Sequence, residues 1–312
     1  MTPAGWLSLA FALSHLERYA AAIEAFELVP RGTMSASAWT SLGFALSHEE
    51  RFEEAVDAFG HVPPEALTDA GWVTLAYALN QLQRHEEAID AYRQVRQMTP
   101  FAWVGMGLAS NRVGRFQDAL AAFARVPDAE TPPAAWAGMG FAHSQLRQNE
   151  EAISAYLRVL SDERTPQMWS NLGFSYSHLR RFREAVDAYE RVPPEERPRD
   201  VWLNLGFAYS HLKDHARVVD AYERVSRDEM PAQGWLNLGF SHFELGHDRE
   251  AEAAAQRAAA LMPGSGTARY LLALVLERTG RRQEAIEALR EALRVEPGHR
   301  GAFSRLRAMG AS

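Results

Sequence analysis

The sequence predicts an all-α protein, a solenoid of about nine helical hairpins closed by a short C-terminal helix. The spacing of its tryptophans is the first observation behind this prediction: seven intervals separate the eight residues, six of 33 residues and one of 31. Apolar residues that recur at helical intervals after each of them are the second. Self-similarity with a period of this length is typical of stacked helix pairs. The eight residues are Trp6, Trp39, Trp72, Trp103, Trp136, Trp169, Trp202 and Trp235.

Each repeat is expected to hold two helices, and repeat six shows why. Thr165 suits the cap position and Pro166 the first helical turn, so that the first helix begins there and keeps its apolar period through Leu179. A second helix is expected over about residues 182–192. It ends there because Pro193 lacks an N–H donor and disfavours helical geometry in the residue before it.

The same pattern places the repeats along the whole chain, which we interpret as a single domain over residues 1–312. Repeats start near residues 3, 36, 69, 100, 133, 166, 199, 232 and 266. A Val–Pro pair ends the second helix in four of them, whereas the second helices of repeats eight and nine continue to Pro263 and Pro297. The segment 300–309 carries three arginines on an otherwise apolar turn, which predicts a capping helix.

A five-residue signature recurs within the repeats. In repeat six it reads Trp169, Leu172, Gly173, Ala185 and Tyr189. This pattern resembles the tetratricopeptide repeat (TPR) family over essentially the whole chain. The resemblance implies antiparallel helix pairs stacked into a right-handed superhelix with a concave groove. Most repeats are one residue shorter than the family's usual length, so the pitch of the superhelix is expected to differ.

Composition excludes several classes of function. A net charge of −7 and the lack of a Lys/Arg block argue against a nucleic-acid partner. Without cysteine there is no thiol nucleophile, thiolate metal site or disulfide. No stretch reaches ~18 apolar residues, and no basic leader precedes the first repeat, so neither a membrane span nor a signal peptide is expected. A cytoplasmic protein is the resulting expectation.

A helical wheel drawn from each Trp separates two faces of the first helix. The packing face holds Trp and the residues 3, 4, 7 and 10 after it, which in repeat seven are Trp202, Leu205, Gly206, Tyr209 and Leu212. The opposite face holds the residues 1, 2, 5, 8 and 9 after Trp, which are Leu203, Asn204, Phe207, Ser210 and His211. By the family resemblance, this second face lines the concave groove.

The groove face combines an aromatic row with amides, hydroxyls and imidazoles. It carries almost no charge, which favours an extended, largely uncharged segment of a partner protein. Helices that pack ~8–10 Å apart span about three residues of extended peptide per repeat. The predicted peptide-binding residues are Phe141, Phe174, Phe207, Phe240, Asn171, Asn204, Asn237, Ser177, Ser210, His178 and His211.

Two alternatives stay open for these residues. The Phe rings either form a recognition surface or pack on a neighbouring repeat, since exposed aromatic rows are costly unless covered. The three Asn side chains, similar to the asparagine ladder of the repeat domain in the enzyme that adds N-acetylglucosamine to intracellular proteins, pair either with a ligand backbone or between repeats. A metal site is disfavoured because equivalent His residues lie ~8–10 Å apart.

No catalytic motif is present. The sequence lacks a phosphate-binding loop with Lys, a His-Glu-x-x-His pair and a Gly-x-Ser-x-Gly elbow. We therefore expect a non-enzymatic scaffold without catalytic residues, metal or cofactor. The alternatives are a self-associating module, in which a second copy docks on the uncapped N-terminal repeat, and the regulatory arm of a larger enzyme.

Overall fold

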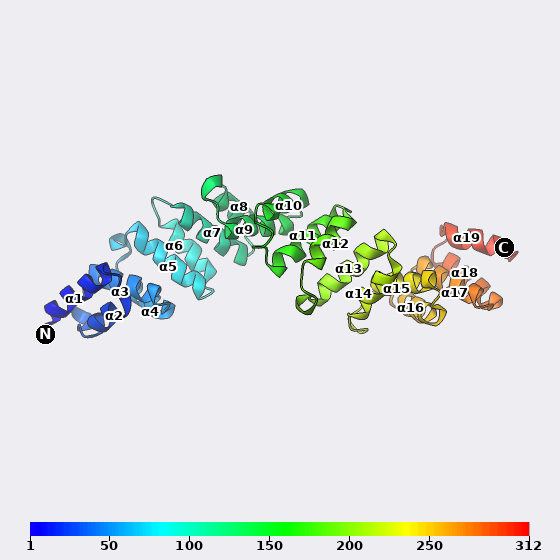
Figure 1. Cartoon of the computed structure of the whole chain (residues 1–312), viewed down its shortest axis with the longest axis horizontal. Helices are drawn as coiled ribbons and strands as arrows, with labels where there is room; N and C mark the ends of the chain where they lie inside the picture. Colours follow the sequence, from blue (N-terminus) through cyan, green and yellow to red (C-terminus); the bar gives the residue numbers. More distant parts are fainter. Residues whose placement is uncertain (312) are drawn as a thin grey trace. The chain divides into compact units, whose positions relative to one another are not determined.

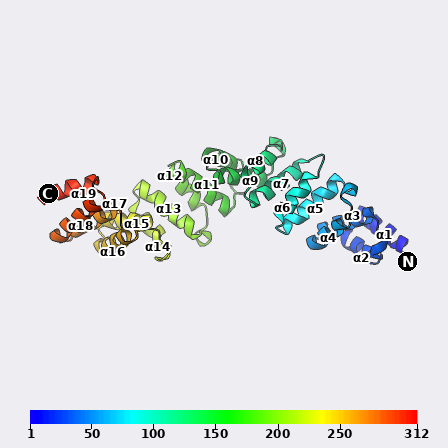
Figure 2. The same cartoon turned by 180° about the vertical axis from the view of Figure 1, so that it is seen from behind.

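The computed structural model describes residues 1–311, which fold into nineteen α-helices and four short 3₁₀ turns, with no strand among them. The predicted all-α solenoid is confirmed. Tight packing divides the chain into two compact units, Met1–Glu163 and Arg164–Ser312. In each unit the helices follow one another as antiparallel pairs (Figure 1), and Figure 2 shows the same pairs from behind. That the two units act as a single domain stays a prediction.

The N-terminal unit contains five hairpins. Its helices are α1 (Pro3–His15), α2 (Tyr19–Glu27), α3 (Ala36–His48), α4 (Phe52–Gly60), α5 (Asp69–Gln81), α6 (His85–Arg93), α7 (Pro100–Arg112), α8 (Phe116–Phe123), α9 (Pro133–Gln145) and α10 (Asn149–Leu157). Short 3₁₀ turns, η1 (Arg31–Thr33), η2 (Pro64–Ala66) and η3 (Asp128–Glu130), follow three of the Val–Pro pairs.

The C-terminal unit contains four hairpins and the capping helix. Its helices are α11 (Pro166–His178), α12 (Phe182–Glu190), α13 (Arg199–Leu212), α14 (His215–Glu223), α15 (Ala232–Leu245), α16 (Asp248–Leu261), α17 (Gly266–Arg278), α18 (Arg282–Val295) and α19 (Arg300–Ala308). The turn η4 (Pro194–Glu196) follows α12. The longer α16 and α18 and the cap α19 agree with the predicted second helices and with the segment 300–309.

Local signals account for the helix ends. The Thr165 side chain accepts a hydrogen bond from the Met168 N–H (3.3 Å), as expected for a cap. At the other end of the hairpin, α12 stops two residues before the predicted Val192. The Val192 N–H donates instead to the Tyr189 carbonyl at 3.1 Å, which turns the chain and buries the valine completely.

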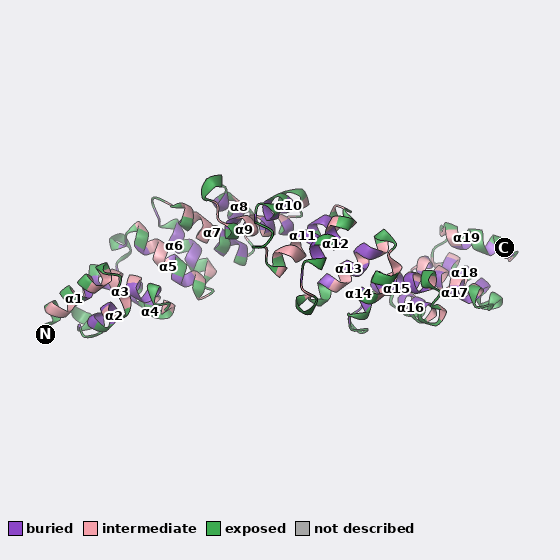
Figure 3. Ribbon diagram, in the orientation of Figure 1, coloured by how far each residue is buried: buried purple, intermediate pink, exposed green. Residues whose placement is uncertain are grey.

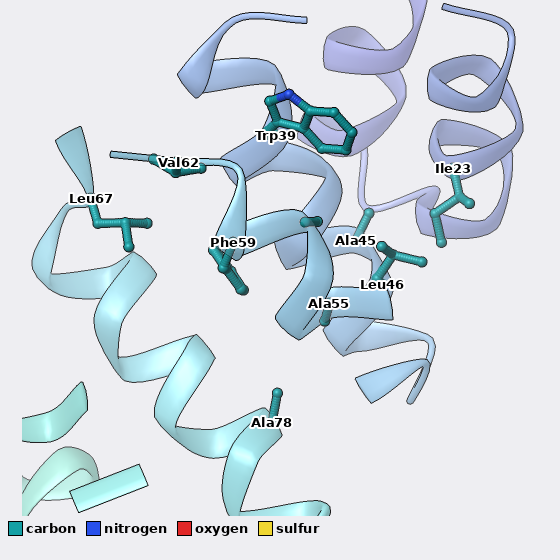
Figure 4. Close-up of a cluster of buried hydrophobic side chains, with 10 residues drawn as sticks. Ile23, Trp39, Ala45, Leu46, Ala55, Phe59, Val62, Leu67 and Ala78 are labelled. Carbon is teal, nitrogen blue, oxygen red and sulfur yellow. The ribbon is translucent and has the colours of Figure 1, made fainter. Parts of the chain in front are cut away.

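The core of each hairpin lies between its two helices, and in five hairpins an aromatic ring of the second helix rests on a glycine of the first. A Cβ atom on Gly173 would lie 2.7 Å from the Tyr189 ring, so only glycine permits this approach. Figure 4 shows the equivalent region of the N-terminal unit, where Trp39, Phe59 and smaller residues from α2 to α5 form one buried cluster. Figure 3 shows buried and exposed residues alternating along the helices.

The two-faced wheel is wrong in two respects. Leu212, assigned to the packing face, is exposed. Ala208, assigned to neither face, is fully buried, as is the small residue at the same register in repeats two to eight. Leu212 is the last residue of α13. Ala208 is buried because α13 packs not only on its own partner α14 but also on α12, α11 and α15. A helix inside a stack therefore buries two flanks, which a single-helix wheel does not represent.

Candidate functional site

The recurring Phe and His side chains of the first helices contact the preceding repeat. In the C-terminal unit the Phe207 ring meets the Phe182 ring edge-on, with 5.9 Å between ring centroids. The His211 ring stacks on the same Phe182 ring, with 4.2 Å between the ring centroids and an angle of 1° between the ring planes. The first residue of a second helix thus supports two side chains of the following first helix.

The same arrangement recurs in the N-terminal unit. His48 stacks on Tyr19 at 4.2 Å and 4°. Edge-on ring pairs join Phe52 to Tyr77 and Phe116 to Phe141. Packing between repeats is therefore one reason why these residues recur, which is one of the two alternatives left open for the Phe row.

Packing does not remove the aromatic row from solvent. Phe174 is 41% exposed, and its ring contacts His178 on its own helix at 4.3 Å. Phe207 and Phe240, like Phe141 in the other unit, are half-buried. The rings support the stack with one edge and leave another edge accessible.

Six of the eleven predicted residues line one hollow of about 350 Å³, which we call the aromatic pocket. It lies over α11, the start of α12 and α13. Its predicted members are Phe174, Ser177, His178, Asn204, Phe207 and His211. Two further members, Arg180 and Phe182, were not predicted.

A second hollow of about 480 Å³, the amide pocket, shares Phe174 and Asn204 with the aromatic pocket. Leu203, Val201 and Pro198 supply apolar surface. The remaining lining residues are Gln167, Ser170, Asn171, Tyr189 and Asp200. The two pockets together contain seven of the eleven predicted residues.

The three asparagines occupy the same register but have different partners. Asn237 accepts a hydrogen bond from Gln233 Nε2 (2.9 Å) and donates through Nδ2 to Tyr222 Oη (3.1 Å), a side chain of the preceding repeat. Asn171 likewise accepts from Gln167 Nε2 at 3.0 Å. Asn237 therefore joins two repeats, as the structural alternative for these residues expected.

Asn204 is the exception. Asp200 stands four residues before it, where the other two asparagines have Gln, and the Asn204 side chain makes no hydrogen bond among residues 1–311. The buried Tyr189 hydroxyl lies next to the side chains of Asn204 and Ser177, which lower its pKa. Burial raises the pKa of Tyr189 by more, so this hydroxyl stays protonated. The Asn204 amide thus borders the amide pocket, whereas the tyrosine hydroxyl is closed to solvent.

The serines and histidines contribute in different ways. Ser210 Oγ donates to the Phe207 carbonyl of its own helix (2.7 Å), whereas Ser177 Oγ is buried without a hydrogen-bond partner among residues 1–311. Burial, together with the nearby Arg180 charge, lowers the pKa of His211, so its ring is neutral near pH 7. A neutral ring stacks on Phe182 without a cost of charge burial.

Sequence reasoning missed Phe182 and Tyr189, although a signal for the first was present. Thirteen residues after Trp, at the start of the second helix, an aromatic side chain stands in repeats one, two, four and six. This position lies on the second helix, outside the wheel drawn for the first. Tyr189 was assigned only to the core, and its hydroxyl was not considered.

The opposite side of the hairpins holds the tryptophans. Five of them lie under an arginine. The shortest distances to the ring centroid are 4.6 Å for Arg158 over Trp136 and 4.8 Å for both Arg164 over Trp169 and Arg197 over Trp202. These contacts agree with the packing role expected for the Trp series.

A further hollow, of about 580 Å³, lies between α14, α15 and α16. Trp235 and the buried His242 are among its lining residues. Burial and the neighbouring His247 lower the pKa of His242, while Glu250 and Glu223 act in the other direction. The two imidazoles are joined by their Nδ1 atoms at 3.3 Å.

Within residues 1–311 there is no helix with the length and hydropathy needed to traverse a lipid bilayer. Nor do three His, Asp or Glu side chains of this described part gather closely enough to hold a metal ion. The histidines of the aromatic pocket instead contact phenylalanine rings.

Comparison with known proteins gives a family. One family model described as tetratricopeptide repeat matches residues 49–102, 73–135 and 236–300, and a second model of that description matches residues 166–192. Together the matches cover more than half of the chain. No curated protein matches the sequence significantly. Similar solved structures include MamA (MSR-1), 20% identical over 53% of this chain and 97% of its own, with a TM-score of 0.49. Another is the C-terminal part of a TPR repeat-containing protein from Cytophaga hutchinsonii, 15% identical over 75% and 99%, with a TM-score of 0.48.

Proposed function

Because the chain belongs to the tetratricopeptide repeat family, we propose that it is a non-enzymatic scaffold that binds an extended segment of a partner protein along α11 and α13. One observation carries the proposal: the aromatic pocket and the amide pocket adjoin, sharing Phe174 and Asn204. An extended peptide needs both kinds of contact, apolar hollows for its side chains and donors or acceptors for its backbone.

The geometry assigns different tasks to the two pockets. In the amide pocket, Asn204 offers a donor and an acceptor to one peptide unit. In the aromatic pocket, Phe174 and Phe207 supply ring surface for an apolar side chain. Because first helices pack ~8–10 Å apart, about three ligand residues cover this distance.

Selection from a phage-displayed library of random peptides tests the proposal. The wild type is expected to enrich peptides whose binding is lost in the variant Phe174→Ala/Asn204→Ala. Phe174 is exposed and Asn204 makes no hydrogen bond, so this variant should keep the melting temperature of the wild type. Failure to enrich any peptide that distinguishes the two proteins would refute the proposal.

Asn237→Ala is the matched control. It removes the same side chain at the same register, but here the amide is bonded to Tyr222 and Gln233. We expect a lower melting temperature, because the Tyr222 hydroxyl loses its partner, with little change in the binding of peptides selected on α11 and α13. A loss of binding without loss of stability would mean that the ladder extends to repeat eight.

Self-association is the second candidate, favoured by exposed apolar side chains on the first hairpin. Leu9 is 37% exposed, Leu16 69% and Leu28 56%. Exposed apolar surface of this kind is typical of contact sites between proteins. Light scattering over a range of concentrations tests it, with Leu16→Gln as the variant expected to restore a constant mass.

A further inference from the structure

In every repeat, a residue just after the first helix has a left-handed backbone. It occupies one register, eleven positions after the Trp position. The φ angle is 60° at Arg180 and 60° at Lys213, and the whole set has values between 55° and 80°. Its members in chain order are Glu17, Glu50, Gln83, Gly114, Arg147, Arg180, Lys213, Gly246 and Gly280. The fold fixes the backbone here and leaves the charge free to vary.

In the C-terminal unit this register is basic where it borders the aromatic pocket. Arg180 is a lining residue of the pocket, and Lys213, the only lysine of the chain, follows His211 by two positions. Neither of the two makes an ion pair or side-chain hydrogen bond among residues 1–311.

The nearby carboxylates are already engaged. Glu184 pairs with Arg181 at 3.0 Å, and Asp214 pairs with Arg217 at 3.5 Å. Asp200, in the amide pocket, pairs with Arg199 at 3.0 Å. A protein of net charge −7 therefore presents two cations without an ion pair at this register, one of which, Arg180, lines the hollow. Such a patch attracts anionic groups and keeps cationic ones away.

The N-terminal unit contains the same ring arrangement with the opposite charge. His48 stacks on Tyr19 as His211 stacks on Phe182. At this stacked pair, the register of Arg180 and Lys213 is occupied by Glu17 and Glu50. The stacked pair is therefore not what makes the aromatic pocket basic, and charge distinguishes the two sites.

We propose that the aromatic pocket takes a large apolar or aromatic side chain from a partner segment that carries Asp or Glu within a few residues of it. This inference rests on the proposed function and names the class of its ligand. The expectation of a largely uncharged ligand considered only the groove face; the residues that end the helices lie outside that face. A protein segment is favoured over nucleic acid, because two cations on an acidic chain are few for a phosphate backbone.

Synthetic peptides of defined charge provide the test. A fluorescein-labelled peptide of about twelve residues, with Phe between Glu residues in an Ala–Ser–Gly background, is compared with a twin that has Lys for Glu and a twin that has Ala for Phe. Fluorescence anisotropy is expected to show binding of the first about ten-fold tighter than that of either twin at ~50 mM salt. The preference for Glu over Lys should shrink at ~300 mM salt, where charges are screened.

The variant Arg180→Gly/Lys213→Gly removes both charges without disturbing the fold. Glycine adopts φ near 60° without strain and occupies this register in three other repeats. We expect about ten-fold weaker binding of the Glu peptide and a melting temperature equal to or above that of the wild type. The matched control is Glu17→Gly/Glu50→Gly, which should leave binding unchanged.

Four outcomes overturn the inference. They are equal affinity for the Glu and Lys peptides, an unchanged affinity in Arg180→Gly/Lys213→Gly, equal weakening in the control, and tighter binding of a single-stranded dT oligonucleotide of matched length. A fifth is self-association that disappears in Arg180→Gly/Lys213→Gly, which would make a second copy the occupant. If library selection enriches groove-dependent peptides without acidic residues, the proposed function stands and this inference alone fails; if nothing is enriched, both fail.

Discussion

Replacing non-glycine residues at the left-handed register should stabilise the N-terminal unit. The variant Glu17→Gly/Glu50→Gly/Gln83→Gly changes three exposed residues with φ of 55°, 58° and 59°. None of these side chains makes a hydrogen bond or ion pair among residues 1–311, so no contact is lost. Left-handed backbone costs a non-glycine residue about 1–2 kcal/mol. The extra freedom of glycine in the unfolded chain offsets about 0.5–1 kcal/mol of this.

The net gain is therefore about 0.5 kcal/mol per site, or about 1.5 kcal/mol for three sites in different repeats, whose effects should add. For a folded unit of this size the melting temperature is expected to rise by about 3–6 °C. Thermal unfolding followed by circular dichroism measures it. A fall in melting temperature would show that these side chains stabilise the protein in a way that the structure does not contain.

A pair of glycine substitutions supplies the control. Gly60 is the last residue of α4 and Gly280 has φ of 80°, and a Cβ atom at either position would meet nothing within 4 Å. Gly60→Ala should stabilise the protein by about 0.5 kcal/mol, because alanine is favoured in helices. Gly280→Ala should destabilise it by about 1 kcal/mol, because only its backbone conformation is unfavourable. Effects of equal sign would refute the reasoning.

Two further predictions concern single side chains. Tyr222→Phe should lower the free energy of unfolding by about 1 kcal/mol, because it breaks the bond to Asn237, whereas Tyr189→Phe, which removes a hydroxyl without a partner, should be neutral or stabilising in the same denaturant titration. Burial and the neighbouring His247 lower the pKa of His242 from its ordinary 6.5, so the unfolded chain binds this proton at a higher pH than the folded chain does. The free energy of unfolding therefore keeps its full value above about pH 6.5 and falls as the pH drops below it. His242→Leu should flatten that fall in melting curves taken between about pH 5 and pH 8; an unchanged slope would contradict the assigned cause.

Much of the fold was predictable because each of its signals is local. A capping Thr before a proline begins α11, and the Trp spacing places the first eight hairpins. The end of α12 was missed by two residues, because the Val192 N–H bonds to the Tyr189 carbonyl and the chain turns there. Ala208 was misassigned because a helix wheel considers one helix at a time.

The candidate site was predictable in its members but not in their partners. Phe174, His211 and Asn204 were named from their register, and the structure brings them to adjoining pockets. Nothing in that register separates Asn204 from Asn237. The difference comes from the residue four positions earlier and from a tyrosine of another repeat, so it depends on tertiary geometry. Peptide binding at these residues stays a prediction.

Helices of each unit touch only the next one or two along the chain, apart from minor contacts. Among residues 1–311, no strand pairing or other long-range contact links the first hairpin of a unit to its last, so the hairpins can unfold one after another. Outer hairpins should peel away before inner ones, and amide exchange with deuterated solvent should slow progressively from α19 toward α15. A ligand bound along several hairpins would link them and reduce the difference in exchange rate between outer and inner hairpins.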